Sequence, residues 1–99
     1  MEKDNDAIML ETLGTAITQL QVKYRSCGLL DRMAMKPALD ELTNDYSNYQ
    51  LRLLKEGVIC SNDDLKAMEA IKGEIDNAAE AQELVGAIAK TIAFIAAKA

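Results

Sequence analysis

Histidine is absent from all 99 residues of this chain. It is the commonest general base and the commonest metal ligand in proteins, so its absence excludes Ser–His and Cys–His nucleophile pairs. The two cysteines, Cys27 and Cys60, are too few for a four-ligand structural zinc site. We therefore expect no enzyme, no metal site and no cofactor.

Other scarcities narrow the class of protein further. There is no tryptophan, one phenylalanine and one proline, so the core must consist of leucine, isoleucine, methionine and alanine, which suit helices. Acidic residues outnumber basic ones, giving a net charge of -5. Direct nucleic-acid binding needs a basic face, so we expect no direct contact with nucleic acid. The first residues lack a signal-peptide pattern, and no apolar run reaches the roughly 20 residues of a membrane span. We expect a cytoplasmic protein.

Apolar residues recur at steps of three and four along three segments. Such steps place side chains on one face of a helix. The three runs are Leu10, Leu13, Ile17, Leu20, Tyr24 and Cys27; Met35, Leu39, Leu42, Tyr46, Tyr49 and Leu53; and Met68, Ile71, Ile75 and Ala78. The pattern predicts a single all-α domain over residues 1–99. Its architecture is an antiparallel helical hairpin plus a long or broken C-terminal helix, giving a three- or four-helix bundle.

Proline and glycine set the expected limits of the first two helices. The first helix is expected over about 5–27, with Gly28 as a left-handed residue that closes it. The second is expected over about 32–56, with a kink or break near 35–37, because proline is tolerated mainly in a first helical turn. Gly57 is expected to close this second helix.

Side chains in the two turns can also be placed. Leu29 and Leu30 are expected to be buried in the first turn. Cys27 lies on an apolar run and is expected in the core, whereas Cys60 is expected to be exposed in the second turn. The two cysteines would lie at opposite ends of a helix roughly 30 Å long, too far apart for a disulfide.

The remaining chain begins with a strong helix start. Ser61 stands three residues before Asp64, a variant of the capping box. No proline and no strong glycine signal follows through residue 98, which favours one continuous helix over 62–98. The alternative is two helices that meet near Asn77.

The stretch 84–97 is the most apolar in the chain, with Lys90 its single charge. A helix that is apolar nearly all round must be buried. It could form the fourth helix of the monomer's own bundle, pack against a second copy or another protein, or lie on a membrane surface. The residues expected to make the apolar contact are Val85, Ile88, Ile92 and Ile95.

Charge is distributed unevenly along the chain. Residues 23–36 carry a net charge of +3, and residues 61–83 carry -5, which predicts an electrically polar molecule. Acids along the second stretch form a candidate face for a basic partner. Those expected to make the electrostatic contact are Glu69, Asp76, Glu80 and Glu83.

These features together predict a protein–protein interaction module, such as a small adaptor, subunit, chaperone or inhibitor. Its partner would be another protein or a second copy in a homo-oligomer. Two alternatives stay open: a membrane-associated protein that uses the apolar C-terminal helix, and an acidic decoy that blocks a nucleic-acid-binding protein.

Overall fold

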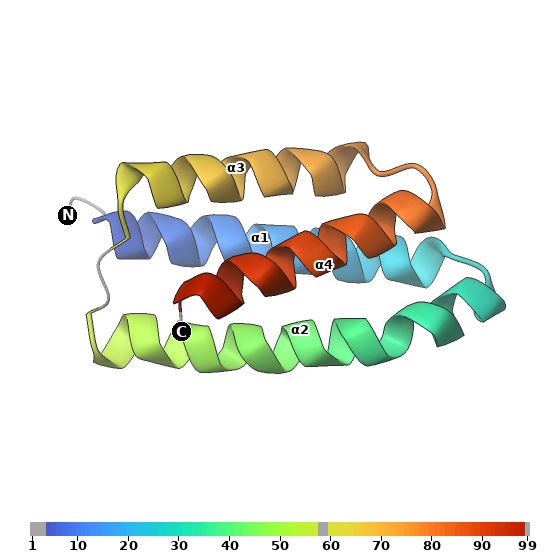
Figure 1. Ribbon diagram of the computed structural model, residues 1–99, viewed down its shortest axis with the longest axis horizontal. Helices are drawn as coiled ribbons and strands as arrows, with labels where there is room; N and C mark the ends of the chain where they lie inside the picture. The colour runs from blue at the N-terminus through green and yellow to red at the C-terminus, as the bar shows by residue number, and fades with distance from the viewer. Residues whose placement is uncertain (1–3, 58–59, 99) are drawn as a thin grey trace.

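A computed structural model describes residues 4–57 and 60–98, and these residues form a bundle of four helices (Figure 1). The helices are α1 (Asn5–Ser26), α2 (Leu29–Lys55), α3 (Asn62–Asn77) and α4 (Ala81–Lys98). No strand occurs in this part of the chain. The all-α class and the bundle architecture are therefore confirmed.

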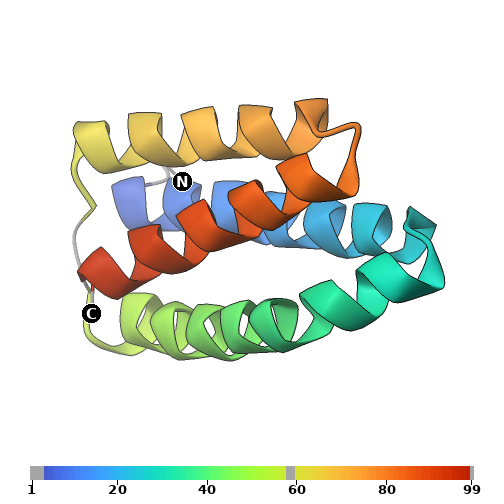
Figure 2. The same ribbon diagram turned by 45° about the vertical axis from the view of Figure 1, so that its right-hand side comes forward.

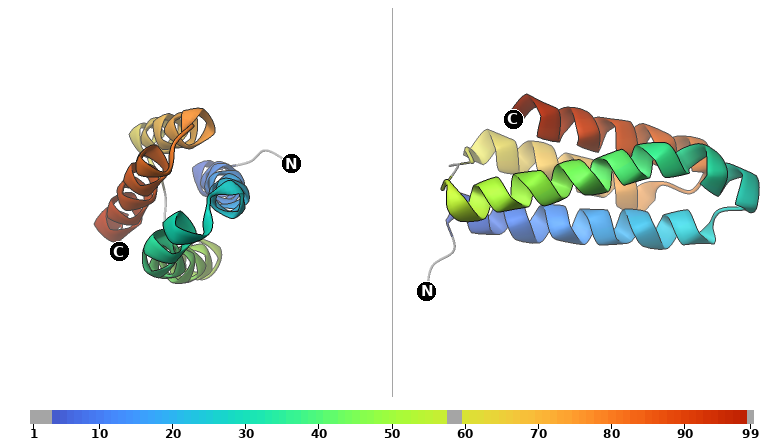
Figure 3. Two further views of the ribbon diagram at one scale, coloured as in Figure 1. Left: turned by 90° about the vertical axis from the view of Figure 1, so that its right-hand side faces the viewer. Right: turned by 90° about the horizontal axis from the view of Figure 1, so that it is seen from below.

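The bundle consists of two antiparallel hairpins, α1–α2 and α3–α4, packed one on the other. Seen end-on, α1 has α2 and α3 as its neighbours, and α4 also has α2 and α3 as its neighbours (Figure 3). The α1–α2 turn and the α3–α4 turn lie at the same end of the molecule (Figure 1). We call this the two-turn end; the α2–α3 connection lies at the opposite end.

The favoured single helix over 62–98 is wrong, and the alternative break near Asn77 is confirmed. Ala78 leaves helical geometry at φ -66° and ψ 117° and ends α3. The carboxylate of Glu83 then accepts hydrogen bonds from the backbone N–H groups of Ala79 and Glu80, each at 3.2 Å. A side chain therefore caps the free amide groups at the start of α4, and the turn needs neither glycine nor proline.

Helix α2 passes through Pro37 without a break and begins at Leu29, earlier than expected. Because proline has no amide hydrogen, one intrahelical hydrogen bond is missing there. The helix bends along this part of its length (Figure 2). The expected kink is thus present, whereas a helix break is not.

The two turn glycines behave differently. Gly57 has φ +62° and follows the end of α2, as predicted. Gly28 has φ -64°, so the expected left-handed closure of α1 is wrong. Cys27 is already extended, and Gly28 serves as the residue that precedes the first turn of α2.

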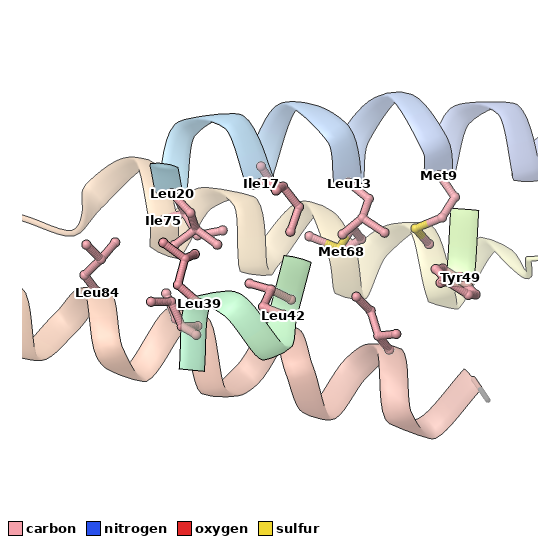
Figure 4. Close-up of a cluster of buried hydrophobic side chains, with 14 of the residues drawn as sticks. Met9, Leu13, Ile17, Leu20, Leu39, Leu42, Tyr49, Met68, Ile75 and Leu84 are labelled. Carbon is pink, nitrogen blue, oxygen red and sulfur yellow. The ribbon is translucent and has the colours of Figure 1, made fainter. Parts of the chain in front are cut away.

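The apolar faces of all four helices meet along the bundle axis (Figure 4). Met9, Leu13, Leu42 and Met68 are completely or almost completely buried there. Thr91 is a polar residue within this core, and its hydroxyl donates to the carbonyl of Ala87 at 2.7 Å, so that its own polar atom is paired. The bundle therefore closes its core with α4 as one of its four walls.

Candidate functional site

The four apolar residues expected to bind a partner do not share an open surface. Ile88 and Ile95 are 1% and 5% exposed and belong to the core, and Ile92 is partly buried against it. Val85, at 46% exposure, is the one that faces solvent. The break before α4 explains this, because it returns the apolar stretch onto its own bundle as the fourth helix.

The four acids proposed as an electrostatic contact are on the surface, and three of them have partners within the chain. Asp76 forms an ion pair with Lys72, Glu69 accepts a long hydrogen bond from a threonine of α1, and Glu83 caps α4. Glu80 is exposed in the α3–α4 turn. Glu69 lies along α3, while the other three gather at the two-turn end.

A different apolar surface is open at the two-turn end. Leu29, Leu30 and Met33 are 64%, 81% and 64% exposed on the first two turns of α2. Residues three and four apart on a helix are neighbours, so the three side chains form one patch, which we call the Leu30 patch. The expectation that Leu29 and Leu30 are buried is wrong: α2 begins at Leu29, and its first turn projects from the bundle instead of filling the turn.

Basic side chains border the Leu30 patch. Arg32 and Lys36 follow Leu29 by three and seven residues, which places them along one edge of the patch. Lys36 is ion-paired with Asp40 at 2.8 Å, so the arginines carry the unpaired charge here. Arg25 lies in the last turn of α1, only four residues before Leu29. Within the described residues neither arginine has an ion-pair partner, and the Nε atom of Arg32 is covered and lacks a hydrogen-bond acceptor.

Acidic side chains lie at this same end, so the predicted charge separation is only partly present. Lys23 at the end of α1 donates from Nζ to the backbone carbonyls of Asp76 and Ala78, at 2.7 and 2.8 Å. This contact joins the basic stretch to the α3–α4 turn, which carries Glu80 and is followed by Glu83 in the first turn of α4. The fold therefore sets opposite charges next to each other, although they are far apart in sequence.

The opposite end holds a buried polar cluster around Cys60. The expectation that Cys60 is exposed is wrong, because the residue is 2% exposed. Its backbone N–H donates to Oδ1 of Asp6 at 2.7 Å, and its carbonyl accepts from Asn5 at 2.8 Å. Its Sγ lies 3.4 Å from the hydroxyl of Tyr49. Burial raises the pKa of the Cys60 thiol and of the Tyr49 hydroxyl, so the thiol is a poor nucleophile.

The same end is closed by the capping box and the end of α4. Ser61 and Asp64 exchange both hydrogen bonds of the box, as predicted. Asp64 also forms an ion pair with Lys98, whose carbonyl in turn accepts from Arg52 at 2.9 Å. The hydrogen bond from Lys98, followed by that from the Ser61 backbone, lowers the pKa of the Asp64 carboxyl. Polar groups here serve to join α2, α3 and α4.

Hollows on the surface are shallow. One of about 260 Å³ lies at the two-turn end, between Lys23, Cys27, Asp31 and Leu84. A wider groove of about 490 Å³ follows α3 and α4, with Gly73 and Gly86 in its lining. Among the residues described, no three cysteine or acidic side chains are grouped to hold a metal ion. Nor is any helix in this part of the chain long and apolar enough to cross a membrane.

Comparison with protein-family models, with curated proteins and with solved structures finds no match for this chain. The functional assignment therefore depends on the surfaces described above.

Proposed function

We propose that this chain is a non-enzymatic protein–protein interaction module that binds its partner through the Leu30 patch. The observation that carries the proposal is the exposure of three large apolar side chains, 64–81%, on one stretch of a regular helix. Fully burying such a side chain is worth about 1.5–3 kcal/mol each. A partner that covers Leu29, Leu30 and Met33 would gain that free energy, which the monomer leaves unused.

The patch contributes little to the fold of the monomer. Its residues lie outside the buried core, and the helix in which they stand continues for more than 20 residues beyond them. Large exposed apolar patches on soluble chains are typical of interaction sites. This supports a role of the patch in binding. Mutation of the patch should therefore reduce binding without lowering the stability of the fold.

The proposal keeps the predicted class of function and moves the contact surface. A contact through Ile88 or Ile95 would require α4 to leave the core, whereas the Leu30 patch needs no rearrangement. We also propose a cytoplasmic location. Both cysteines are free thiols, which persist best in reducing compartments.

The test compares two double variants of the full chain. In the first, Leu30→Ser and Met33→Ser remove most of the patch. In the second, Leu51→Ser and Leu54→Ser remove two other exposed leucines, 51% and 65%, at the other end of α2. Each immobilised variant is incubated with an extract of the source cells, and retained proteins are identified by mass spectrometry. We expect one or more proteins retained by the wild type to be lost with the first variant and kept with the second.

Circular dichroism and urea unfolding provide the control for folding. The free energy of unfolding of each variant should stay within about 0.5 kcal/mol of the wild type, as for other surface substitutions. A first variant that folds normally and retains every protein that the wild type retains would rule out the proposal.

A further inference from the structure

We infer that the occupant of the Leu30 patch is an acidic amphipathic helix of a partner protein. The inference rests on the proposed function and adds the chemistry of the partner. The charges beside the apolar side chains favour an acidic partner. The same charges disfavour a second copy of the chain and an anionic membrane.

The apolar side chains define the shape of the occupant. Leu29, Leu30 and Met33 span little more than one helical turn, and all three are exposed on it. An amphipathic helix with apolar residues at steps of three and four offers a stripe of matching width. Such a stripe covers the patch with side chains from two successive turns.

The cations define the charge of the occupant. Arg25 is exposed without an ion-pair partner in the described chain, and Arg25 can lie no further than about 14 Å from Leu29 along four residues. The covered Nε of Arg32 has no acceptor, and a covered donor without a partner is unfavourable. A carboxylate beside the patch would give the exposed guanidinium group of Arg25 a charge-assisted hydrogen bond, which is stronger than a neutral one. Arg32 would contribute its positive charge, because its covered Nε is out of reach of a partner in this conformation.

A second copy of the chain fits this surface poorly. The other exposed leucines of α2, Leu51 and Leu54, stand next to Arg52 and Lys55. Antiparallel pairing of two α2 helices would set these leucines on the Leu30 patch, but it would also bring Lys55, which has no ion-pair partner in the described chain, towards the basic border of the patch; Arg52 is ion-paired with Glu56. Like charges that face each other in an interface disfavour association.

An anionic membrane also fits poorly. Asp31 is exposed in the first turn of α2, and at the same end Glu80 is exposed in the α3–α4 turn and Glu83 in the first turn of α4. A flat anionic surface that reached the arginines would also approach these acids, because all of them lie at the two-turn end. A helix of about 10 Å diameter, by contrast, can contact the arginines and leave the acids in water.

Two synthetic peptides of 18 residues test the inference. Both carry the same leucine and isoleucine stripe on one helix face; one has glutamate and the other has lysine at every position of the polar face. Binding of each fluorescent peptide to the full-length protein is measured by anisotropy at 0.15 M salt. We expect the acidic peptide to bind at least tenfold more tightly than the basic one.

Charge reversal on the protein completes the test. Arg25→Glu with Lys36→Glu changes two exposed cations at the patch, and Lys55→Glu with Lys66→Glu changes two exposed cations elsewhere, so both variants carry the same net charge. Only the first should lose the preference for the acidic peptide. An equal loss in both variants, equal affinity for the two peptides, tighter binding of the basic one or no binding of either would overturn the inference.

Vesicles separate the remaining occupant. Tighter binding to phosphatidylserine vesicles than to phosphatidylcholine vesicles, lost with Leu30→Ser and Met33→Ser, would assign the patch to a membrane and overturn the inference. A different result would refute the proposed function: the variant with Leu30→Ser and Met33→Ser would retain every protein that the wild type retains. A protein partner that depends on the patch, combined with peptides that show no charge preference, refutes the inference alone.

Discussion

Replacing Asp6 by alanine tests how Cys60, which precedes α3, is held to α1. Asp6 is 8% exposed, and its Oδ1 accepts the backbone N–H of Cys60 at 2.7 Å. Asp6→Ala leaves this buried N–H without an acceptor. A hydrogen bond to a charged group contributes about 1.5–3 kcal/mol, and an orphaned buried donor is unfavourable by about 1–3 kcal/mol. We expect the free energy of unfolding to fall by about 2 kcal/mol.

For a domain of this size each kcal/mol corresponds to roughly 4–8 °C, so the Tm of Asp6→Ala should fall by about 8–16 °C. Asp6→Asn keeps an oxygen in the same place and should lose less than half as much. The measurements are thermal unfolding by circular dichroism and urea unfolding at pH 7. The alkylation rate of Cys60 gives a local readout, and it should rise more in Asp6→Ala than in Asp6→Asn.

Asp63→Ala is the matched control. Asp63 is an exposed acid in the first turn of α3, with no hydrogen-bond partner among the described residues, and its removal changes the net charge equally. Asp63→Ala should lower the free energy of unfolding by about 0.3–1 kcal/mol, which is the contribution of an exposed charge at a helix N-terminus. If Asp6→Ala and Asp63→Ala destabilise the protein equally, the buried hydrogen bond does not hold the connection and the reasoning is refuted.

Three further predictions concern thiols, pH and glycines. In the folded protein at pH 8, iodoacetamide should modify the half-buried Cys27 well before the buried Cys60, and equal rates, followed by mass spectrometry, would contradict the structure. Because the folded-state pKa of Asp64 lies below its unfolded value of about 3.9, its contribution to stability is present above that pH and lost as the pH falls further; urea unfolding should show a weaker loss in Asp64→Asn between pH 5 and pH 2. Gly86→Ala should stabilise the protein by up to about 1 kcal/mol, since the added methyl meets open space in a helix, whereas Gly57→Ala should destabilise it by about 1–2 kcal/mol because its φ is +62°; the same sign for both in urea unfolding would contradict this.

The helices themselves could be predicted because local signals agree with the final packing. The apolar runs through Leu13, Leu42 and Met68 became the buried faces of α1, α2 and α3, since a three-and-four spacing has one helical solution. The capping box at Ser61 fixed the start of α3 for the same reason: both of its hydrogen bonds form within four residues. Residues close together in the sequence were therefore sufficient to predict these helix faces and this helix start.

The α3–α4 turn was not predicted because the start of α4 carries only one of the two residues of a capping box. Glu83 occupies the third position of α4 and accepts from the backbone N–H of Glu80, which is the reciprocal half of a capping box. The residue at the cap position is glutamate, where serine or threonine would normally announce a helix start. An acid placed three residues after a non-helical residue was therefore the available signal, and it is weak without its partner.

The surface at the two-turn end depends on where α2 and α4 begin, and the sequence pattern does not determine either start. Had α2 begun near Pro37, Leu29 and Leu30 would have been free to fold into the turn; since it begins at Leu29, helical geometry holds them outward beside Met33. Had residues 62–98 formed one helix, Glu80 would lie midway along it; since the chain turns at Ala78–Glu80, this acid lines the same hollow as Lys23 of α1. An apolar patch between unpaired arginines and nearby acids selects its partner by charge position, because a uniformly charged surface meets both signs at once. The specificity we infer is therefore a product of where two helices begin, and it would change if either start moved.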